Sequence, residues 1–140
     1  MSSISFTSPH VLVTITAIGM GSFFGAILRW YLSNLLNPLN IELPVGTLTS
    51  NLLGGYLIGI AISYFAINQE FSPLWRLFII TGFLGGLTTF STFSAETVEL
   101  MIHSKFSEAI LLISLHLVGS IAATFFGIKS GKLLFGENSP

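Results

Sequence analysis

A run of hydroxyl and aromatic side chains, TTFSTFS at residues 88–94, lies inside a segment that otherwise reads as a membrane span. Five of the seven side chains carry hydroxyls, and the other two are Phe90 and Phe93, spaced i and i+3. Hydroxyl hydrogens can replace the waters that hydrate an anion. The edge of a phenylalanine ring carries the positive part of its quadrupole and can also face an anion. Core packing is the simpler alternative for two rings in a chain with 13 phenylalanines.

Other polar residues in apolar segments extend this run. An amide buried alone in hydrocarbon is most simply explained by an interhelical hydrogen bond, but here the amide, a histidine and several hydroxyls occur in three different segments. Together they suggest a polar track through the bilayer. The members of this predicted track, besides the two phenylalanines, are Asn51, Ser91, Thr92, Ser94, His116 and Ser120.

The centre of the predicted track carries no fixed charge. Arg29 is the only basic residue at a plausible membrane depth, and Glu96 and Glu99 follow the hydroxyl run toward the far end of their segment. A proton-coupled antiporter of the small multidrug-resistance type would use an acid at mid-depth. Neutral donors instead suit an anion that must lose water without being held tightly. A passive anion path is therefore favoured, with the antiporter and a purely structural membrane subunit as alternatives.

The composition places the chain in a bilayer. Of its 140 residues 51% are hydrophobic and 8% are charged, against about a quarter charged in soluble domains, and the mean hydropathy is +0.83. The absence of cysteine excludes disulfides and thiolate metal sites, and the net charge of -1 shows no basic footprint for nucleic acid. The three histidines lack acidic partners at metal-ligand spacing. No enzyme chemistry is predicted.

Four apolar runs near 20 residues long predict an all-α membrane protein with four spans. They form one domain over residues 1–140, with spans at about 11–36, 45–67, 74–103 and 106–126. Because no Lys or Arg precedes the first run, we expect a retained span rather than a cleaved signal peptide. The short loops predict antiparallel neighbours.

Glycines shape two further predictions. The pairs Gly21-xxx-Gly25, Gly55-xxx-Gly59 and Gly82-xxx-Gly86 place small residues one turn apart, which lets membrane helices approach closely. The run GFLGGLTT, residues 82–89, is a poor uninterrupted helix. We therefore expect a broken third helix within this run, with the interruption near residues 82–86, and the freed carbonyls need protein, water or a cation as partners.

The Lys/Arg balance leaves the orientation open. The side that carries both termini has three basic residues and the other side has two, whereas a clear excess normally sets the topology. Either the count misses effects at the helix ends, or the chain inserts both ways and pairs head to tail.

The motif GFLGGLTTFSTFSAE closely resembles the signature of the Fluc (CrcB) fluoride channels, and GAILRWYL and PVGTLTSNLLGGYLIG support it. The resemblance extends over all four spans. It implies an antiparallel, dual-topology homodimer that exports fluoride passively across the bacterial inner (plasma) membrane and so confers fluoride resistance.

The resemblance also implies roles for individual residues. The fluoride pore would be lined by Phe90 and Phe93, by Asn51 of the second span and by the hydroxyls of the third, with Arg29 in the vestibule. His116 and Ser120 would be the polar positions on the fourth span, and His116 departs from the tyrosine that the family often has at the first of them. A structural sodium ion would bind the backbone carbonyls of Gly85 and Thr88.

Overall fold

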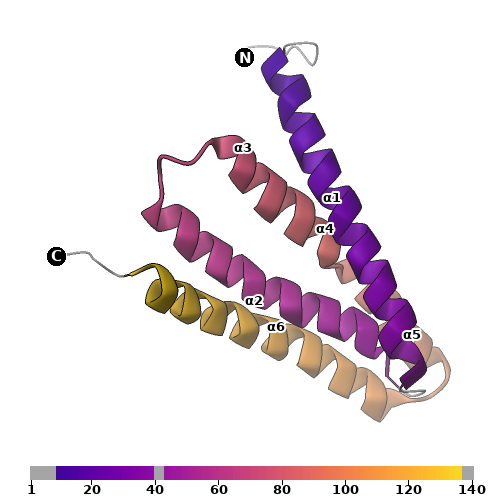
Figure 1. Cartoon of the computed structure of the whole chain (residues 1–140). Coiled ribbons are helices and arrows are strands. Elements are labelled where there is room, and N and C mark those ends of the chain that lie inside the picture. The colour runs from indigo at the N-terminus through magenta and orange to yellow at the C-terminus, as the bar shows by residue number, and fades with distance from the viewer. Residues whose placement is uncertain (1–8, 40–42, 137–140) are drawn as a thin grey trace, which may run out of the picture.

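The computed structural model describes residues 9–39 and 43–136, and over these residues the regular elements are all helical (Figure 1). In chain order they are α1 (Pro9–Leu36), the 3-10 turn η1 (Asn37–Leu39), α2 (Val45–Ile67), α3 (Pro73–Arg76), the π-helical η2 (Leu77–Leu84), α4 (Gly85–Leu87), α5 (Phe90–Ile102) and α6 (Phe106–Phe135). The four elements from α3 to α5 follow one another along a single span.

Four helical segments are long and apolar enough to cross a membrane, which confirms the four predicted spans. Their bounds are Pro9–Leu36, Val45–Ile67, Pro73–Ile102 and Phe106–Phe135. The last helix continues to Phe135, whereas the hydropathy pattern placed the end of the span near residue 126. No proline interrupts residues 127–135, and the helix stops at Gly136, whose φ of 85° is one that glycine adopts readily.

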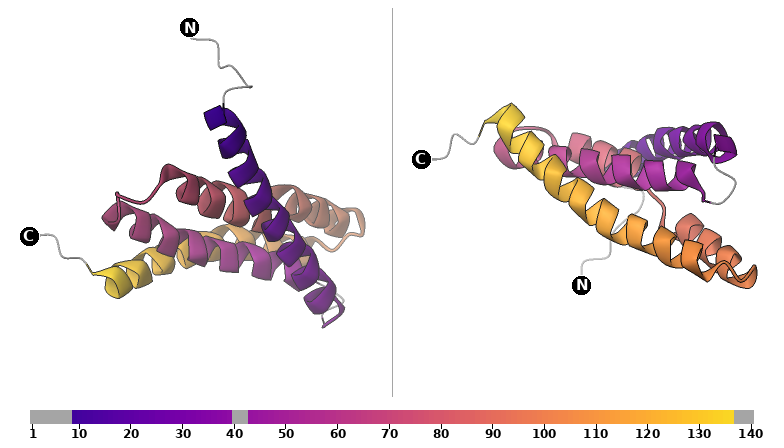
Figure 2. Two further views of the ribbon diagram at one scale, coloured as in Figure 1. Left: turned by 45° about the horizontal axis from the view of Figure 1, so that its top comes forward. Right: turned by 90° about the horizontal axis from the view of Figure 1, so that it is seen from below.

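The helix break changes the neighbour against which the third span packs. Before the break, η2 and α4 lie against α1; after it, α5 packs mainly on α6. Seen from below, α5 lies with the first half of α6 on the side away from α1 (Figure 2). The most extensive pairing joins α2 and α6, which run side by side. The break therefore lies between the two halves of the bundle.

Glycines bring the paired helices into backbone contact, as the sequence predicts. A Cβ atom on Gly25 of α1 would meet the carbonyl oxygen of Phe83 in η2. A Cβ atom on Gly59 of α2 would meet the carbonyl oxygen of Thr124 in α6. Close backbone approach of this kind is how membrane helices gain packing energy without a hydrophobic driving force.

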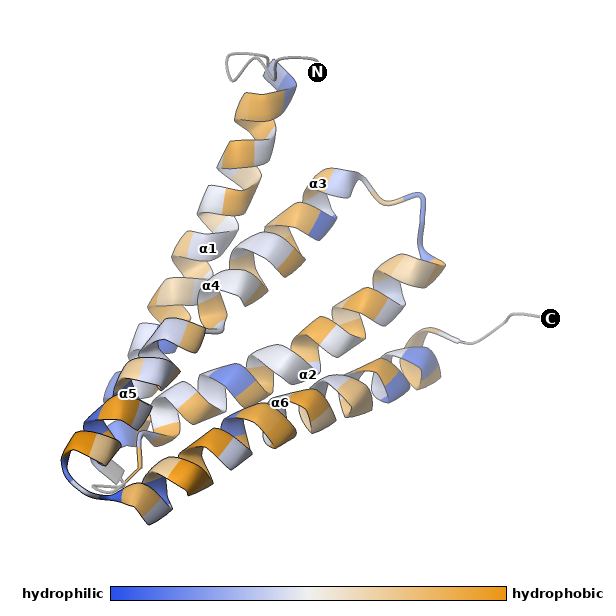
Figure 3. Cartoon of the chain, turned by 180° about the vertical axis from the view of Figure 1, so that it is seen from behind, coloured by the Kyte–Doolittle hydropathy of each residue, from blue (hydrophilic) through white to orange (hydrophobic). Residues whose placement is uncertain are grey.

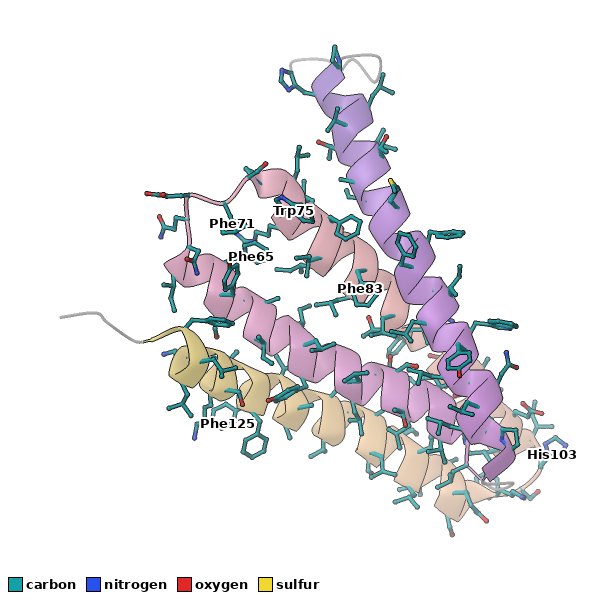
Figure 4. The ribbon with its side chains drawn as sticks, in the orientation of Figure 1. Phe65, Phe71, Trp75, Phe83, His103 and Phe125 are labelled. Atoms are coloured by element: carbon teal, nitrogen blue, oxygen red, sulfur yellow. The ribbon has the colours of Figure 1, made fainter. Side chains whose placement is uncertain are left out.

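The connections between helices are held by local contacts. At the start of α2, Asn37 Oδ1 accepts a hydrogen bond from the Gly46 amide at 2.7 Å. At the start of α3, Ser72 caps the helix and Pro73 occupies the first turn, a position that proline favours. Phe65 of α2 and Phe71 of the following loop lie close together (Figure 4), with their ring centroids 6.4 Å apart.

Hydrophobic residues recur along all four spans (Figure 3), and many large apolar side chains are exposed in the single chain. Hydrophilic residues gather where α5 turns into α6, and a hydrophilic patch interrupts the N-terminal half of α2. That half of α2 contains Asn51, which faces the helix break.

Candidate anion site at the helix break

The break in the third span lies at Thr88 and Thr89. Thr88 has ψ of 153° and Thr89 has φ of -151°, so both are extended between α4 and α5. The sequence predicts an interruption near residues 82–86 within the run 82–89, and the break lies at the C-terminal end of that run. Gly82 and Gly86 stay helical because they pack against the backbone of α1. The chain instead leaves the helix at two β-branched residues, which tolerate extended backbone well.

Asn51 joins α2 to the break through both ends of its amide. Its Oδ1 accepts a hydrogen bond from the Thr89 N–H at 2.8 Å, and its Nδ2 donates to the Thr89 carbonyl at 3.0 Å. Nδ2 also lies 2.9 Å from Nδ1 of His116 in α6. One side chain therefore satisfies the backbone of an extended residue that no helical partner can reach.

The aromatic rings of the predicted track meet beside this amide. Phe93 is 6% exposed and stacks on His116, with centroids 4.4 Å apart and ring planes inclined by 26°. Phe90 is 73% exposed and meets Phe93 edge to face, at 5.5 Å and 67°. The structure thus distinguishes two rings that the sequence treats alike, one packed against the histidine and one open.

The break also removes hydrogen-bond donors from backbone carbonyls. In a continuous helix the Thr89 N–H would donate to the Gly85 carbonyl, but it donates to Asn51. Likewise the Thr92 N–H, which would serve the Thr88 carbonyl, donates to the Thr89 hydroxyl at 3.2 Å. These two carbonyls, predicted from the resemblance to hold sodium, lose the donors that a regular helix supplies.

An open cavity of about 510 Å³ lies against the break. Its lining residues share two properties: they come from α2, α6 and both sides of the break, and none carries a formal charge. The polar ones are Asn51, Thr88, Thr89, His116 and Ser120, and the aromatic ones are Phe90 and Phe93. The cavity therefore gathers Asn51, Phe90, Phe93, His116 and Ser120 of the predicted track.

Three other members of the predicted track lie outside this cavity lining. Ser91 is exposed and its hydroxyl lies 3.2 Å from that of Thr89, while Thr92 accepts a hydrogen bond from Thr89 at 3.1 Å. The Ser94 hydroxyl donates to the Phe90 carbonyl within α5, as serine often does in a helix. In the single chain these three residues are not part of the cavity lining, although Ser91 and Thr92 contact Thr89, which is.

Arg29 lies apart from the cavity lining as well. Its Nε donates to the Gly86 carbonyl at 3.2 Å. Gly86 is one of the residues whose carbonyl loses its helical partner at the break. In the single chain Arg29 therefore caps the end of α4.

Two contacts at the break escaped the sequence reasoning. Thr89 is the N-cap of α5, and its position directly before the helical FSTFS was an available signal, because threonine is a common N-cap. The Thr47 hydroxyl donates to Glu96 Oε1 at 2.6 Å, joining α2 to α5. Glu96 Oε2 is buried and has no hydrogen-bond partner among the described residues. The sequence spacing of Thr47 and Glu96 does not predict that they pair.

The fold and the cavity define a class: a four-span helical membrane protein with an uncharged, ligand-sized cavity at a broken helix. Residues 16–128 match the family model described as CrcB-like protein, Camphor Resistance (CrcB). The chain belongs to this family.

Similar proteins carry a functional name. A protein of Dechloromonas aromatica is 57% identical over 111 residues, which cover 79% of this chain and 82% of that protein. One of Nitrosospira multiformis is 54% identical over 123 residues (88% and 96%), and one of Burkholderia mallei is 53% identical over 119 residues (85% and 93%). Each of the three is named as a fluoride-specific ion channel, FluC.

Proposed function

We propose that this chain forms a fluoride-specific ion channel, a multi-pass protein of the bacterial inner membrane that lets fluoride leave the cell passively. The names of its relatives identify the ion. The observation in this chain that carries the proposal is the cavity at the helix break, whose lining residues include hydrogen-bond donors and aromatic rings but no charged side chain. Such a lining can replace hydration water without trapping the anion.

The chemistry at the cavity follows from the geometry of its rings and donors. Phe90 and Phe93 meet edge to face, an arrangement in which the positive edge of one ring points at the face of the other. We propose that an anion in the cavity meets the outer edges of these rings, while neighbouring hydroxyls and amides supply hydrogen bonds. We assign the fluoride path to Asn51, Phe90, Phe93, His116 and Ser120.

The remaining hydroxyls of α5 fit the path only if it extends beyond one protomer. Ser91, Thr92 and Ser94 lie outside the cavity lining, and Phe90 is largely exposed. We propose that a second copy in the opposite orientation covers this face, so that the hydroxyls continue the path. In the single chain the cavity is open, and Phe90 in its lining is exposed. Labelling of a terminal cysteine from both sides of the membrane supports dual insertion, and labelling from one side only contradicts it.

The backbone carbonyl oxygens at the break are suitable ligands for a sodium ion. The Gly85 and Thr88 carbonyls lack their helical donors because Thr89 and Thr92 donate elsewhere, and carbonyl oxygens suit a hard monovalent cation. When bound, the ion would supply positive charge to the freed helix end and so stabilise the fold. A midpoint of thermal unfolding that rises with sodium, at constant ionic strength made up with choline, supports the site. An unchanged midpoint contradicts it.

The antiporter alternative finds no support in the cavity. Proton coupling needs an ionisable acid in the path, and Glu96 and Glu99 are both outside the lining. Among the described residues no hydroxyl of this lining forms a hydrogen bond with His116, and no catalytic role is proposed.

Fluoride efflux from liposomes that contain the purified protein tests the function, with chloride efflux as the comparison. Rapid fluoride loss with chloride retained supports a fluoride-specific channel. Equal loss of both ions, or loss of neither, contradicts it.

A further inference from the structure

The hydrogen bonds of Asn51 determine which nitrogen of His116 carries a proton. Asn51 Oδ1 accepts from the Thr89 N–H, so the amide orientation is fixed, and one Nδ2 hydrogen goes to the Thr89 carbonyl. The second Nδ2 hydrogen is left for His116 Nδ1, 2.9 Å away. A ring nitrogen that accepts a hydrogen bond bears no hydrogen. His116 is therefore neutral, with its proton on Nε2.

No other arrangement keeps all three hydrogen bonds. A hydrogen on Nδ1 would face the Asn51 NH2 group, donor against donor. Rotating the amide by 180° would bring Oδ1 to His116 but would place NH2 against the Thr89 N–H. Protonation of Nδ1 thus costs a hydrogen bond at the helix break, whichever way Asn51 turns.

Apart from its contact with Asn51, the His116 ring is held by packing and by no second hydrogen bond among the described residues. The side chain is 4% exposed, and among the described residues its Nε2 is buried without a hydrogen-bond partner. The ring is held by the Asn51 contact and by its stack on Phe93. A change at Nδ1 is therefore transmitted to Asn51 rather than absorbed by another bond.

We propose that His116 is a positioning residue that, through Asn51, locks the extended backbone at Thr89, and that protonation of its ring releases this lock. The proposal rests on the proposed channel function for its consequence, which is that acid weakens fluoride conduction. It assigns a role to the nitrogen that faces Asn51, separate from any contact that the ring makes with the anion.

Because no charged side chain of the described residues binds His116, the hydrogen bonds of the ring govern whether it takes up a proton. Among residues 9–39 and 43–136, His116 forms no hydrogen bond or ion pair with a charged side chain. The titratable residues of the helices packed against it are Tyr56 and Tyr64 of α2 and Glu96 and Glu99 of α5, and those of its own helix are Glu108, Lys129 and Lys132. Of these, Glu96 is bound to Thr47, Tyr56 to Ser130, and Lys129 lies over the Phe125 ring.

Nitrogen-15 spectra of histidine-labelled protein test the tautomer without any transport assay. The chain has three histidines. The set of signals that disappears in His116→Asn is assigned to His116. We expect the Nδ1 resonance of His116 at an unprotonated position and Nε2 at a protonated one. An Nδ1–H tautomer, or a charged ring at neutral pH, would overturn the proposal.

Two substitutions distinguish the role of Nδ1 as a hydrogen-bond acceptor from the role of the ring in stacking. In His116→Asn, the new Oδ1 takes the place of Nδ1 and can accept from Asn51, although the ring is lost. In His116→Phe, the ring can still stack on Phe93, but no acceptor remains. We expect fluoride efflux in the Asn variant to exceed that in the Phe variant about tenfold, the effect of one unsatisfied buried donor. Equal efflux, or a faster Phe variant, would overturn the proposal.

A pH series on the wild type connects the two readouts. The Thr89 amide resonance and the His116 Nδ1 resonance are followed from about pH 8 to about pH 5, across the ordinary range of histidine, and efflux is measured at each pH with protein-free liposomes subtracted. We expect the Thr89 signal, the Nδ1 signal and efflux to change together as the pH falls. Signals and efflux that stay constant down to about pH 5 would contradict the release by acid. Protonation of Nδ1 without a change at Thr89 would contradict the proposal. A protein without fluoride efflux would refute the channel function, while the spectra would still decide the lock.

Discussion

Replacing Asn51 with alanine should unlock the broken helix, and the size of the effect follows from its contacts. Asn51 makes three hydrogen bonds, two to the Thr89 backbone and one to His116. At about 1 kcal/mol for each bond lost, Asn51→Ala should lower the free energy of unfolding by about 3 kcal/mol. Fluoride efflux should fall as well, because the substitution removes a donor from the cavity lining.

A second variant tests the NH2 group of the Asn51 amide separately from its oxygen. Asn51→Asp keeps an oxygen that can accept from the Thr89 N–H, but it has no hydrogen for the Thr89 carbonyl or for His116 Nδ1. At neutral pH a carboxylate oxygen then faces the Thr89 carbonyl oxygen, and this repulsion should lower the stability further. Fluoride in the cavity should also meet a like charge. We expect efflux lower than in Asn51→Ala.

Asn68 supplies the matched control. It makes one hydrogen bond, from its Nδ2 to the Tyr64 carbonyl at the end of α2, and lies outside the cavity lining. Asn68→Ala should cost about 1 kcal/mol and leave efflux at the wild-type level. Both quantities are measured on protein that elutes as a single peak in size exclusion, by unfolding in mixed micelles and by liposome efflux. An Asn51→Ala protein with the stability and efflux of Asn68→Ala would refute the lock at Thr89.

Three further outcomes are expected. Phe90→Ile should reduce fluoride efflux sharply, because the positive ring edge is lost, with a loss of stability below about 1.5 kcal/mol, because apolar volume is roughly conserved; wild-type efflux would return the ring to a packing role. Gly59→Ala should destabilise the protein by about 1–3 kcal/mol, since the new methyl group meets the Thr124 carbonyl, whereas Gly19→Ala, where nothing lies within 4 Å, should not; equal unfolding midpoints for the two variants would contradict this packing. Ser120→Ala should be mild, because other hydrogen-bond donors remain in the cavity lining, and efflux as low as in Asn51→Ala would show that the donors are not interchangeable.

The number of spans and the interruption of the third could be predicted from the sequence because bilayer length and backbone satisfaction restrict a membrane chain severely. The run 82–89 that contains the break could also be predicted, but the residues at which the helix breaks could not. Glycine propensity favoured residues 82–86, but tertiary packing against α1 overrode it by holding Gly82 and Gly86 in helix. Helix propensity is a local quantity, and the contact that decided the outcome comes from a residue of another span.

The membership of the cavity could be predicted only in part, for a similar reason. Asn51, Phe90, Phe93, His116 and Ser120 were identified because polar and aromatic residues are conspicuous in an apolar sequence. Their pairing depends on helix rotation, which composition does not give. The Thr47–Glu96 hydrogen bond and the amide link from Asn51 to Thr89 both join α2 to the third span, and only the folded chain brings them together.

Selective fluoride efflux is the most direct test of the central claim, that an uncharged cavity at a broken helix conducts fluoride. Purified protein is reconstituted in liposomes loaded with equal fluoride and chloride, and both ions are followed outside with ion-selective electrodes after a potassium ionophore sets the membrane potential. The account predicts rapid release of fluoride, retention of chloride, and loss of fluoride release in Asn51→Ala at equal protein density. Chloride release at the rate of fluoride, or wild-type release from Asn51→Ala, would contradict it.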